Sequence, residues 1–193
     1  MMKKILIGTH NKGKFKEIAY LISKKYKKIS PTTLKIKSPA ETGKTFIANS
    51  RLKAKFFSKH VDYPVISDDS GLCIKSLGNK PGVHSARLAK NKGGFKKAMK
   101  YILKRMKNKK KRSATFVCSL SFKSPQKRVV NVVGKIEGTI SKKIQGNHGF
   151  GYDPIFIPNF ENKTFGEISY YKKIKIDHRF EAFKKLKKKI KTL

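Results

Sequence analysis

The stretch KKILIGTHNKGK, residues 3–14, carries the pattern that decides the fold. Its first half, Lys3–Gly8, is a short aliphatic run of the kind that forms a buried strand. A polar loop, Thr9–Lys14, follows it, and apolar residues then recur at helical spacing, which predicts a helix over about 14–23. A strand, a polar loop and a helix in direct succession indicate an α/β protein.

The rest of the chain continues this mixture of helices and strands. Helical spacing predicts helices over 46–56, over 95–106 and after Asp177, and Thr42 or Thr45 can cap the first of these. One face of the second helix consists of apolar residues: Phe95, Ala98, Met99, Ile102 and Met106. Apolar and β-branched runs predict strands over 65–67, 72–77, 114–122 and 129–140, with a turn at Ser124-Pro125 between the last two. No repeat, linker or low-complexity segment divides the sequence, so we expect a single α/β domain over residues 1–193.

The composition is strongly basic, because 48 Lys and Arg residues against 11 Asp and Glu give a formal net charge of +37. Such a chain should bind polyanions non-specifically, and a dedicated nucleic-acid-binding protein is one alternative function. Lysine is spread along the whole chain instead of being gathered with stacking aromatics, which favours compositional drift over that function. Because acids are so scarce, each acid inside a motif is informative.

The sequence predicts neither a membrane protein nor a secreted one. Its longest apolar runs, such as Val129–Val133, are far shorter than the roughly 20 residues that span a bilayer. The basic N-terminus has too short an apolar run for a signal peptide. Cys73 and Cys118 lie in apolar runs, as reduced core cysteines do. We therefore expect a cytoplasmic protein.

An acidic pair, Asp68 and Asp69, lies at the end of the strand predicted over 65–67. Ser70-Gly71 follows, and Gly71 would allow a tight turn there. Adjacent carboxylates are costly to bury without a cation, so lysine in a structural ion pair and Mg²⁺ beside substrate phosphates are both candidate partners. Because successive strand residues point to opposite faces, we expect the two aspartates to have different roles. One could bind the metal while the other orients or deprotonates an attacking water.

Residues 8–14, GTHNKGK, match the G-x-x-x-x-G-K beginning of a phosphate-binding P-loop. The Ser or Thr that should come next is Phe15, and a second fragment, Gly43-Lys44-Thr45, has Ser38 in place of the first glycine. The chain is therefore not an ordinary P-loop NTPase. A loop that contacts phosphate through helix N-terminal N–H groups and lysine remains the prediction for Thr9–Lys14.

Two further motifs contain groups suited to a nucleotide. The run GNHGFGYDP at 146–154 places three glycines around Phe150, and we expect it to present Phe150 and Tyr152 to a ligand such as a purine base. At the beginning of the last predicted helix, Asp177 is a candidate cap. His178 and Arg179 beside it can donate to keto or phosphate oxygens.

Six motifs in this order resemble those of the inosine triphosphate pyrophosphatase family, whose members clear non-standard purine nucleotides. They are THNKGK at 9–14, ETGKTF at 41–46, SDDSGL at 67–72, PGVHSAR at 81–87, GFGYDP at 149–154 and His178-Arg179. The resemblance implies an elongated α/β fold with a long central mixed sheet flanked by helices and an active-site cleft between two lobes. It also implies a Mg²⁺-dependent homodimer that hydrolyses inosine, deoxyinosine and xanthosine triphosphates to the monophosphate and pyrophosphate.

The resemblance further implies roles for individual residues. Asp69 would be the catalytic proton acceptor and a metal ligand, with Asp68 in support. Substrate contacts would come from a set near the N-terminus and beside the acidic pair: Thr9, His10, Asn11, Lys12, Gly13, Lys14 and Ser70. The base would be enclosed, and the nucleotide site completed, by a second set: Phe150, Gly151, Tyr152, Asp153, Lys173, His178 and Arg179.

Three positions depart from the family pattern. His10 replaces a usual glycine, and Asp177 replaces a usual serine. Ala40 stands where the family has its metal-binding glutamate, so that the neighbouring Glu41 is the candidate ligand. Two alternatives are a basic nucleic-acid-binding protein with a structural acidic pair, and a Mg²⁺-dependent nucleotide hydrolase that differs in base preference or releases orthophosphate. In the pyrophosphatase interpretation, any nucleic-acid binding is expected to be non-specific.

Overall fold

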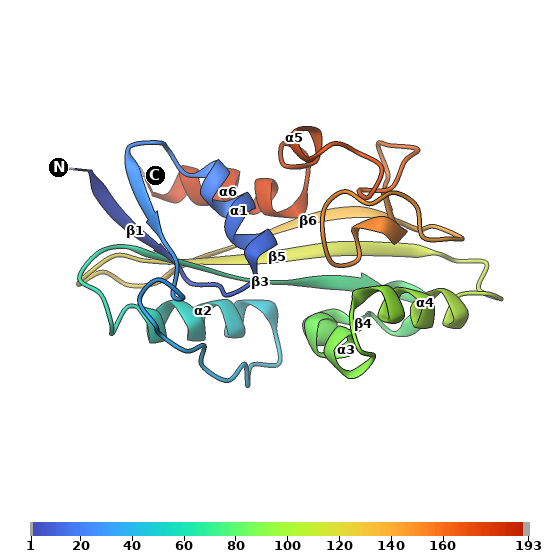
Figure 1. The fold of residues 1–193 in the computed structure, drawn as a ribbon, viewed down its shortest axis with the longest axis horizontal. Coiled ribbons are helices and arrows are strands. Elements are labelled where there is room, and N and C mark those ends of the chain that lie inside the picture. The colour runs from blue at the N-terminus through green and yellow to red at the C-terminus, as the bar shows by residue number, and fades with distance from the viewer. Residues whose placement is uncertain (1, 191–193) are drawn as a thin grey trace. The chain divides into compact units, whose positions relative to one another are not determined.

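A computed structural model describes residues 2–190 and contains one mixed seven-stranded sheet (Figure 1). The strand order is β2-β1-β3-β5-β6-β7, and the short β4 pairs with β3. β1 is parallel to β2 and β3, whereas β4 is antiparallel to β3 and β7 to β6. The strands are β1 Lys3–Ile7, β2 Tyr26–Ile29, β3 Val65–Ile74, β4 Lys80–Pro81, β5 Ser113–Lys123, β6 Val130–Ile140 and β7 Phe156–Pro158.

Helices flank this sheet, which confirms the predicted α/β class with a mixed sheet. Within residues 2–190 the α-helices are α1 Lys12–Leu21, α2 Phe46–Phe57, α3 Ser85–Asn91, α4 Phe95–Arg105, α5 Tyr170–Lys173 and α6 His178–Lys189. No helix among these residues is long and apolar enough to cross a bilayer.

The contacts of the chain divide it into two compact units. Among the described residues, the first unit comprises 2–69, 118–134 and 179–190, and the second unit comprises 70–117 and 135–178. The three long strands β3, β5 and β6 each belong partly to one unit and partly to the other. The expectations of a single domain and of a cleft between lobes stay predictions.

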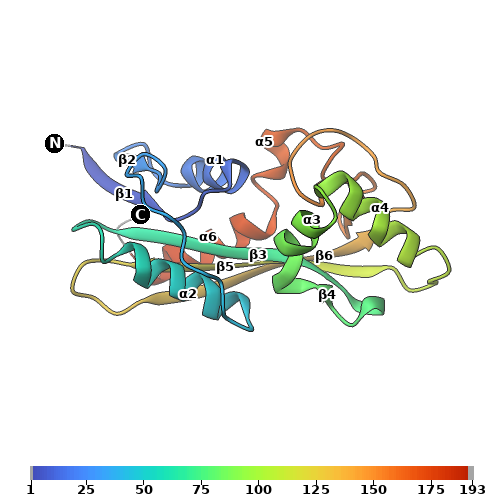
Figure 2. The same cartoon turned by 60° about the horizontal axis from the view of Figure 1, so that its bottom comes forward.

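The first unit packs apolar side chains on both faces of β1. Ile5 and Ile7 belong to one buried cluster and Leu6 to another, as the two-residue alternation of a strand requires. The Ile5 cluster includes Ile18 of α1 and Phe183 of α6, and the Leu6 cluster includes Phe57 of α2. Figures 1 and 2 show α2 on the opposite side of β1 from α1.

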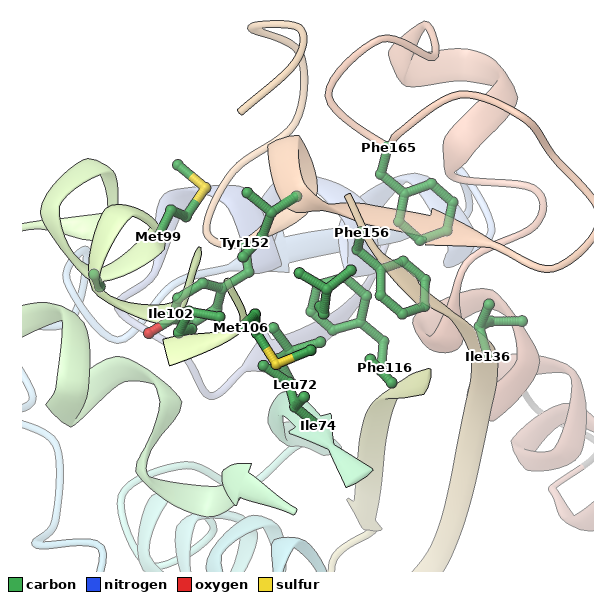
Figure 3. Packing of buried hydrophobic residues seen from close by; sticks show 14 of the residues in the cluster. Leu72, Ile74, Met99, Ile102, Met106, Phe116, Ile136, Tyr152, Phe156 and Phe165 are labelled. Carbon is green, nitrogen blue, oxygen red and sulfur yellow. The ribbon is translucent and has the colours of Figure 1, made fainter. Parts of the chain in front are cut away.

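The second unit has a separate core around three phenylalanines (Figure 3). The Phe116 ring centroid lies 4.5 Å from that of Phe156 and 6.2 Å from that of Phe165. The face predicted for α4 packs into this core through Ala98, Met99, Ile102 and the following Met106, with Phe95 at its edge. The predicted helix and its inward face are therefore confirmed.

Two predicted boundaries are wrong, and both corrections concern candidate site residues. The acidic pair lies in the middle of a continuous ten-residue strand, β3, and not at a strand end. Gly71 makes no tight turn there, because the backbone remains extended, and the Leu72 N–H donates to Ser85 Oγ at 2.9 Å. α1 begins at Lys12, because the Asn11 side chain caps it, so Lys12–Lys14 form its first turn instead of a loop.

Other local predictions are confirmed. Thr45 caps α2 by accepting from the Ala48 N–H, which selects it over Thr42. β5 and β6 are sheet neighbours joined by a turn that contains Ser124-Pro125. Cys118 is fully buried and Cys73 half-buried, and both are free thiols.

Candidate active site

The position of Asp68 and Asp69 within β3 points their side chains to opposite faces of the strand. Both are buried, with Asp68 0% and Asp69 4% exposed. The two carboxylates have different partners, as the strand alternation predicts. Each one therefore has an environment of its own.

Asp68 is neutralised by cations of the first unit. Lys14 Nζ lies 3.1 Å from Asp68 Oδ2, and Arg179 Nε lies 3.8 Å from the same oxygen. Burial alone would raise the pKa of Asp68, but the charges of Lys14, Lys53 and Arg179 outweigh it and hold the pKa at about 2. Arg179 is itself paired with the buried Glu17. Asp68 is therefore a permanent carboxylate that fixes Lys14 in place.

The pKa of Asp69, unlike that of Asp68, is shifted toward neutral pH. Burial, together with repulsion from Glu41, raises the pKa of Asp69 to about 6 against the opposing effects of Lys14, Lys53 and a hydrogen bond. That hydrogen bond comes from Asn49 Nδ2, which donates to Asp69 Oδ2 at 3.0 Å. A carboxylate with a pKa of about 6 is ionised at neutral pH and is still a useful proton acceptor. Asp69 is therefore the best placed general base of the first unit.

Lys53 joins Glu41 to the aspartates. Its Nζ lies 2.5 Å from Glu41 Oε1, and the side chain is almost completely buried. Burial lowers the pKa of Lys53, but Asp68, Asp69 and Glu41 outweigh it, so the pKa is raised and the ammonium stays charged. Sequence reasoning missed both Lys53 and Asn49. The available signal was their spacing of four residues, which places two polar groups on one face of α2.

The predicted phosphate loop forms the beginning of α1. Asn11 Oδ1 accepts from the Lys14 N–H at 3.0 Å, and Thr9 Oγ1 accepts from the Asn11 N–H at 3.2 Å. Gly8 must remain a glycine, because a Cβ there would lie 2.2 Å from Ser67 Oγ. A helix N-terminus with Lys12 and Lys14 in its first turn is a favourable environment for phosphate.

His10 lies against another part of the first unit. Its Nδ1 is 2.7 Å from Ser38 Oγ, and its Nε2 is 3.0 Å from the Ile36 carbonyl oxygen. Because both ring nitrogens contact the 36–38 segment, the ring tethers this segment to the phosphate loop. The structure thus gives a local reason for histidine at a position where the family usually has glycine.

In the second unit, Asp153 organises the glycine-rich loop. Asp153 Oδ2 lies 2.7 Å from Lys173 Nζ and accepts from the Phe150 N–H at 2.8 Å. Lys173 Nζ is also 4.8 Å from the centroid of the Phe150 ring. Gly149 has a positive φ of 72°, and a Cβ there would lie 2.1 Å from Asp153 Oδ2. The loop therefore closes tightly around an Asp–Lys pair.

The expected presentation of two aromatic rings is wrong for Tyr152. Its ring is 3% exposed within the core, and its hydroxyl donates to the Ser85 carbonyl oxygen at 2.9 Å. Phe150 is half-buried and keeps some accessible surface. His178 is buried and stacks on Phe116 with ring centroids 4.8 Å apart. The signal that could have identified Tyr152 as a core residue was its spacing of three and four residues from the buried Ile155 and Phe156.

The structure thus gathers the predicted residues into two groups. Lys14, Asp68, Asp69 and Arg179 meet in the first unit, with Glu41 linked to them through Lys53. Phe150, Asp153 and Lys173 meet in the second unit. Ser70 and Gly151 adjoin these groups along the chain, and Asp177 lies 4.0 Å from Lys173 Nζ.

The carboxylates of the first unit fit a hard divalent cation. Mg²⁺ is usually held by one or two carboxylates together with substrate phosphates, and not by an all-protein cage. Between residues 2 and 190, no three His, Cys, Asp or Glu side chains gather closely enough to form such a cage. Asp69 and Glu41 provide two carboxylates that repel one another across Lys53. A site completed by phosphate oxygens is consistent with this donor set.

A carboxylate of raised pKa beside lysines and a helix N-terminus is typical of enzymes that act on phosphate compounds. The comparisons with known proteins make this class specific. The family model described as the Ham1 family matches residues 5–189. The chain belongs to the Ham1 family.

Characterised relatives and solved structures agree with this assignment. The dITP/XTP pyrophosphatase of Oceanobacillus iheyensis is 41% identical, with both chains covered completely, and that of Bacillus subtilis is 39% identical, with 97% of each covered. The structure of the Staphylococcus aureus Ham1 protein superposes with a TM-score of 0.87 at 32% identity, covering 98% of both chains. A Ham1 protein from Coxiella burnetii gives 0.86 at 30% identity over the full length of both.

Proposed function

We propose that this protein hydrolyses inosine, deoxyinosine and xanthosine triphosphates to the nucleoside monophosphate and pyrophosphate. Relatives that are 35–41% identical over nearly their whole length are dITP/XTP pyrophosphatases. The observation that carries the proposal for this chain is Asp69, a buried carboxylate with a pKa of about 6 beside the buried Lys53 and the half-buried Lys14. These groups match a reaction that needs a proton acceptor next to a polyanion.

The triphosphate would bind at the beginning of α1. Lys12 and Lys14, the N–H groups of the first helical turn, and Lys53 would offset its negative charge. Asp68 and Arg179 would act mainly by holding Lys14 and the helix, because they are committed to ion pairs within the first unit. Thr9 and Asn11 shape the loop that receives the phosphates.

In the reaction, Asp69 takes a proton from a water molecule whose oxygen attacks the α-phosphorus. The new P–O bond forms as the bond from that phosphorus to the α–β bridging oxygen breaks, and pyrophosphate leaves with the bridging electrons. Positioning of the water and electrostatic stabilisation of the phosphates supply most of the acceleration. Asp69 with Glu41 would hold Mg²⁺, which would neutralise phosphate charge when bound, and Asp68 would support them indirectly by holding Lys14.

The base would be recognised by residues of the second unit. Phe150 offers an aromatic ring for stacking, and Lys173, His178 and the backbone of 150–153 offer donors for a 6-keto oxygen. Adenine has an amino group at that position and would leave such donors unpaired, which disfavours it. We propose that the protein is a single domain and acts as a cytoplasmic homodimer.

Product analysis tests this function directly. The purified protein is incubated with Mg²⁺ and, separately, inosine, xanthosine, adenosine and guanosine triphosphates, and the products are separated by ion-exchange chromatography. We expect inosine and xanthosine monophosphates with pyrophosphate, and much slower turnover of the two standard nucleotides. Release of orthophosphate would refute the bond assignment. Absence of turnover, with tight and salt-sensitive binding of DNA or RNA, would instead favour the nucleic-acid-binding alternative.

A further inference from the structure

Asn49, in the first turn of α2, uses both ends of its side-chain amide. Its Oδ1 accepts from the Gly43 N–H at 2.7 Å, and its Nδ2 donates to Asp69 Oδ2 at 3.0 Å. The side chain is 2% exposed, so water does not replace these bonds easily. One amide therefore joins the segment that contains Glu41 to the proposed general base.

The direction of this amide is fixed by its partners. A backbone N–H can only donate, so the atom that faces Gly43 must be the amide oxygen. The NH₂ group must then face Asp69, and Asp69 Oδ2 must be the acceptor. The bond therefore holds the carboxylate in one orientation and assigns Oδ2 to Asn49.

Gly43 permits the close approach on which this arrangement depends. A Cβ at position 43 would lie 2.5 Å from Asn49 Oδ1 and 2.8 Å from the Ala48 Cβ. Any larger residue would displace the amide or the segment. The glycine of the ETGKTF motif thus has a steric function within the first unit.

The helix that carries Asn49 is itself anchored by buried hydroxyls. Ser50 Oγ lies 2.9 Å from Ser119 Oγ and 2.8 Å from Ser121 Oγ, and both serines belong to β5. Asn131 of β6 contacts Ser121 in turn. These polar contacts add to the buried apolar side chains of α2, such as Ala54 and Phe57, in holding the helix.

We propose that Asn49 is a positioning residue that sets the orientation of the Asp69 carboxylate and couples it to the 41–43 segment. The inference rests on the proposed function, because it assigns to Asn49 a part in that reaction. Asn49 acts through Asp69 and needs no contact with the substrate. Small errors in the placement of a reacting group cost up to about a hundredfold in rate, so the effect should appear in kcat.

The kinetic test compares Asn49→Asp with two controls. Asn49→Asp keeps the size of the side chain and an acceptor for Gly43, but it cannot donate to Asp69. We expect kcat for inosine triphosphate to fall about 10–100-fold, with KM changed less than about threefold. Asn159→Asp, at an exposed position, makes the same charge change, and Ser50→Ala loosens α2 without touching Asp69. Both controls should keep kcat within about threefold of the parent.

A double-mutant cycle of melting temperatures at residues 49 and 69 tests the contact without measuring turnover. Asn49→Asp places two carboxylates against each other and should lower Tm, whereas adding Asp69→Asn restores a donor and should raise Tm again. Unchanged kcat in Asn49→Asp, an equal loss in Ser50→Ala, or additive Tm changes in the cycle would each overturn the proposal. A parent protein that releases no pyrophosphate would refute the proposed function, and the cycle would still report on the contact between residues 49 and 69.

Discussion

Each unit of the molecule pairs a buried aspartate with a lysine, but the surroundings of the two pairs differ. In the second unit, Asp153 lies 2.7 Å from Lys173 and also accepts from the Phe150 N–H, so its charge is used to close a loop. In the first unit, Asp68 lies 3.1 Å from Lys14, and the next residue is a second carboxylate. Burial raises the pKa of Asp69, and the lysines that help to keep Asp68 ionised offset this effect only in part. A carboxylate that is fully paired with a cation stabilises the structure, whereas a buried carboxylate that is only partly paired has a raised pKa and can accept a proton.

The largest expected effect follows from removing the incompletely paired carboxylate. Asp69→Asn keeps the shape of the side chain but removes the proton acceptor, so kcat for inosine triphosphate should fall by about 10³-fold or more. Asp62→Asn is the matched control, because Asp62 is exposed, and its kcat should stay within about twofold. Circular dichroism should show both variants folded. A fully active Asp69→Asn protein would remove Asp69 from the mechanism.

Loss of the lysine from the buried Asp153–Lys173 pair should lower stability more than loss of the lysine from the exposed Glu161–Lys172 pair. Lys173→Met leaves Asp153 buried without its cation, and breaking a buried pair in this way costs about 3–5 kcal/mol. Lys172→Met removes the adjacent lysine, which is 55% exposed in its pair with Glu161, and should cost less than about 1 kcal/mol. Urea unfolding of the two variants measures the difference. Equal losses would mean that Asp153 and Lys173 are not the structural pair of this unit.

The pH dependence of activity should follow the pKa of Asp69. Below about pH 6 the carboxylate becomes protonated and cannot accept a proton, so kcat/KM should fall about tenfold per pH unit on the acidic side. Initial rates at constant ionic strength between pH about 4.5 and about 8, from about 1.5 units below the pKa of Asp69 to about 2 units above it, test this. A profile that is flat down to pH about 4.5 would show that the base is another group.

The two aspartates should affect folding stability in opposite directions. The pKa of Asp68 is about 2 when folded and about 4 when unfolded, so its stabilising contribution is lost as pH falls from about 4 to about 2. The pKa of Asp69 is raised on folding, so the folded state binds more protons, and its contribution declines as pH rises from about 4 to about 6. Unfolding free energies across this range should lose the first slope in Asp68→Asn and the second in Asp69→Asn.

The sequence predicted the fold class and most elements because their apolar periodicity is local. The face of α4 and the strand Lys3–Ile7 are visible in the spacing of their own residues. The break expected at Gly71 was wrong, because β3 continues beyond it in pairing with strands that come later in the chain, such as Cys73 with Pro81 of β4. Local propensity contains no information about such a partner.

The candidate site could be predicted as a set of residues but not as an arrangement. The motifs identified Asp68 and Asp69, and strand alternation predicted that their roles differ. Which aspartate receives the cations depends on Lys14 and Arg179, whose approach is set by the packing of α1 and α6. The burial of Tyr152 and the contacts of Asn49 likewise follow from tertiary packing that spacing alone does not reveal.

The smallest expected effect concerns the charge that both units share. A net charge of +37 should attract a triphosphate over long range. Between about 20 and about 300 mM salt the Debye length contracts roughly fourfold, so kcat/KM should fall a few-fold while kcat changes little. Two triple Lys→Gln variants compare the units: exposed lysines 96, 97 and 100 on α4, and 187, 188 and 189 on α6. Each should lower kcat/KM by less than about threefold at low salt and leave it unchanged at high salt. A larger loss in one variant would identify the unit whose surface guides the substrate, and a salt-independent kcat/KM would show that the basic surface has no part in capture.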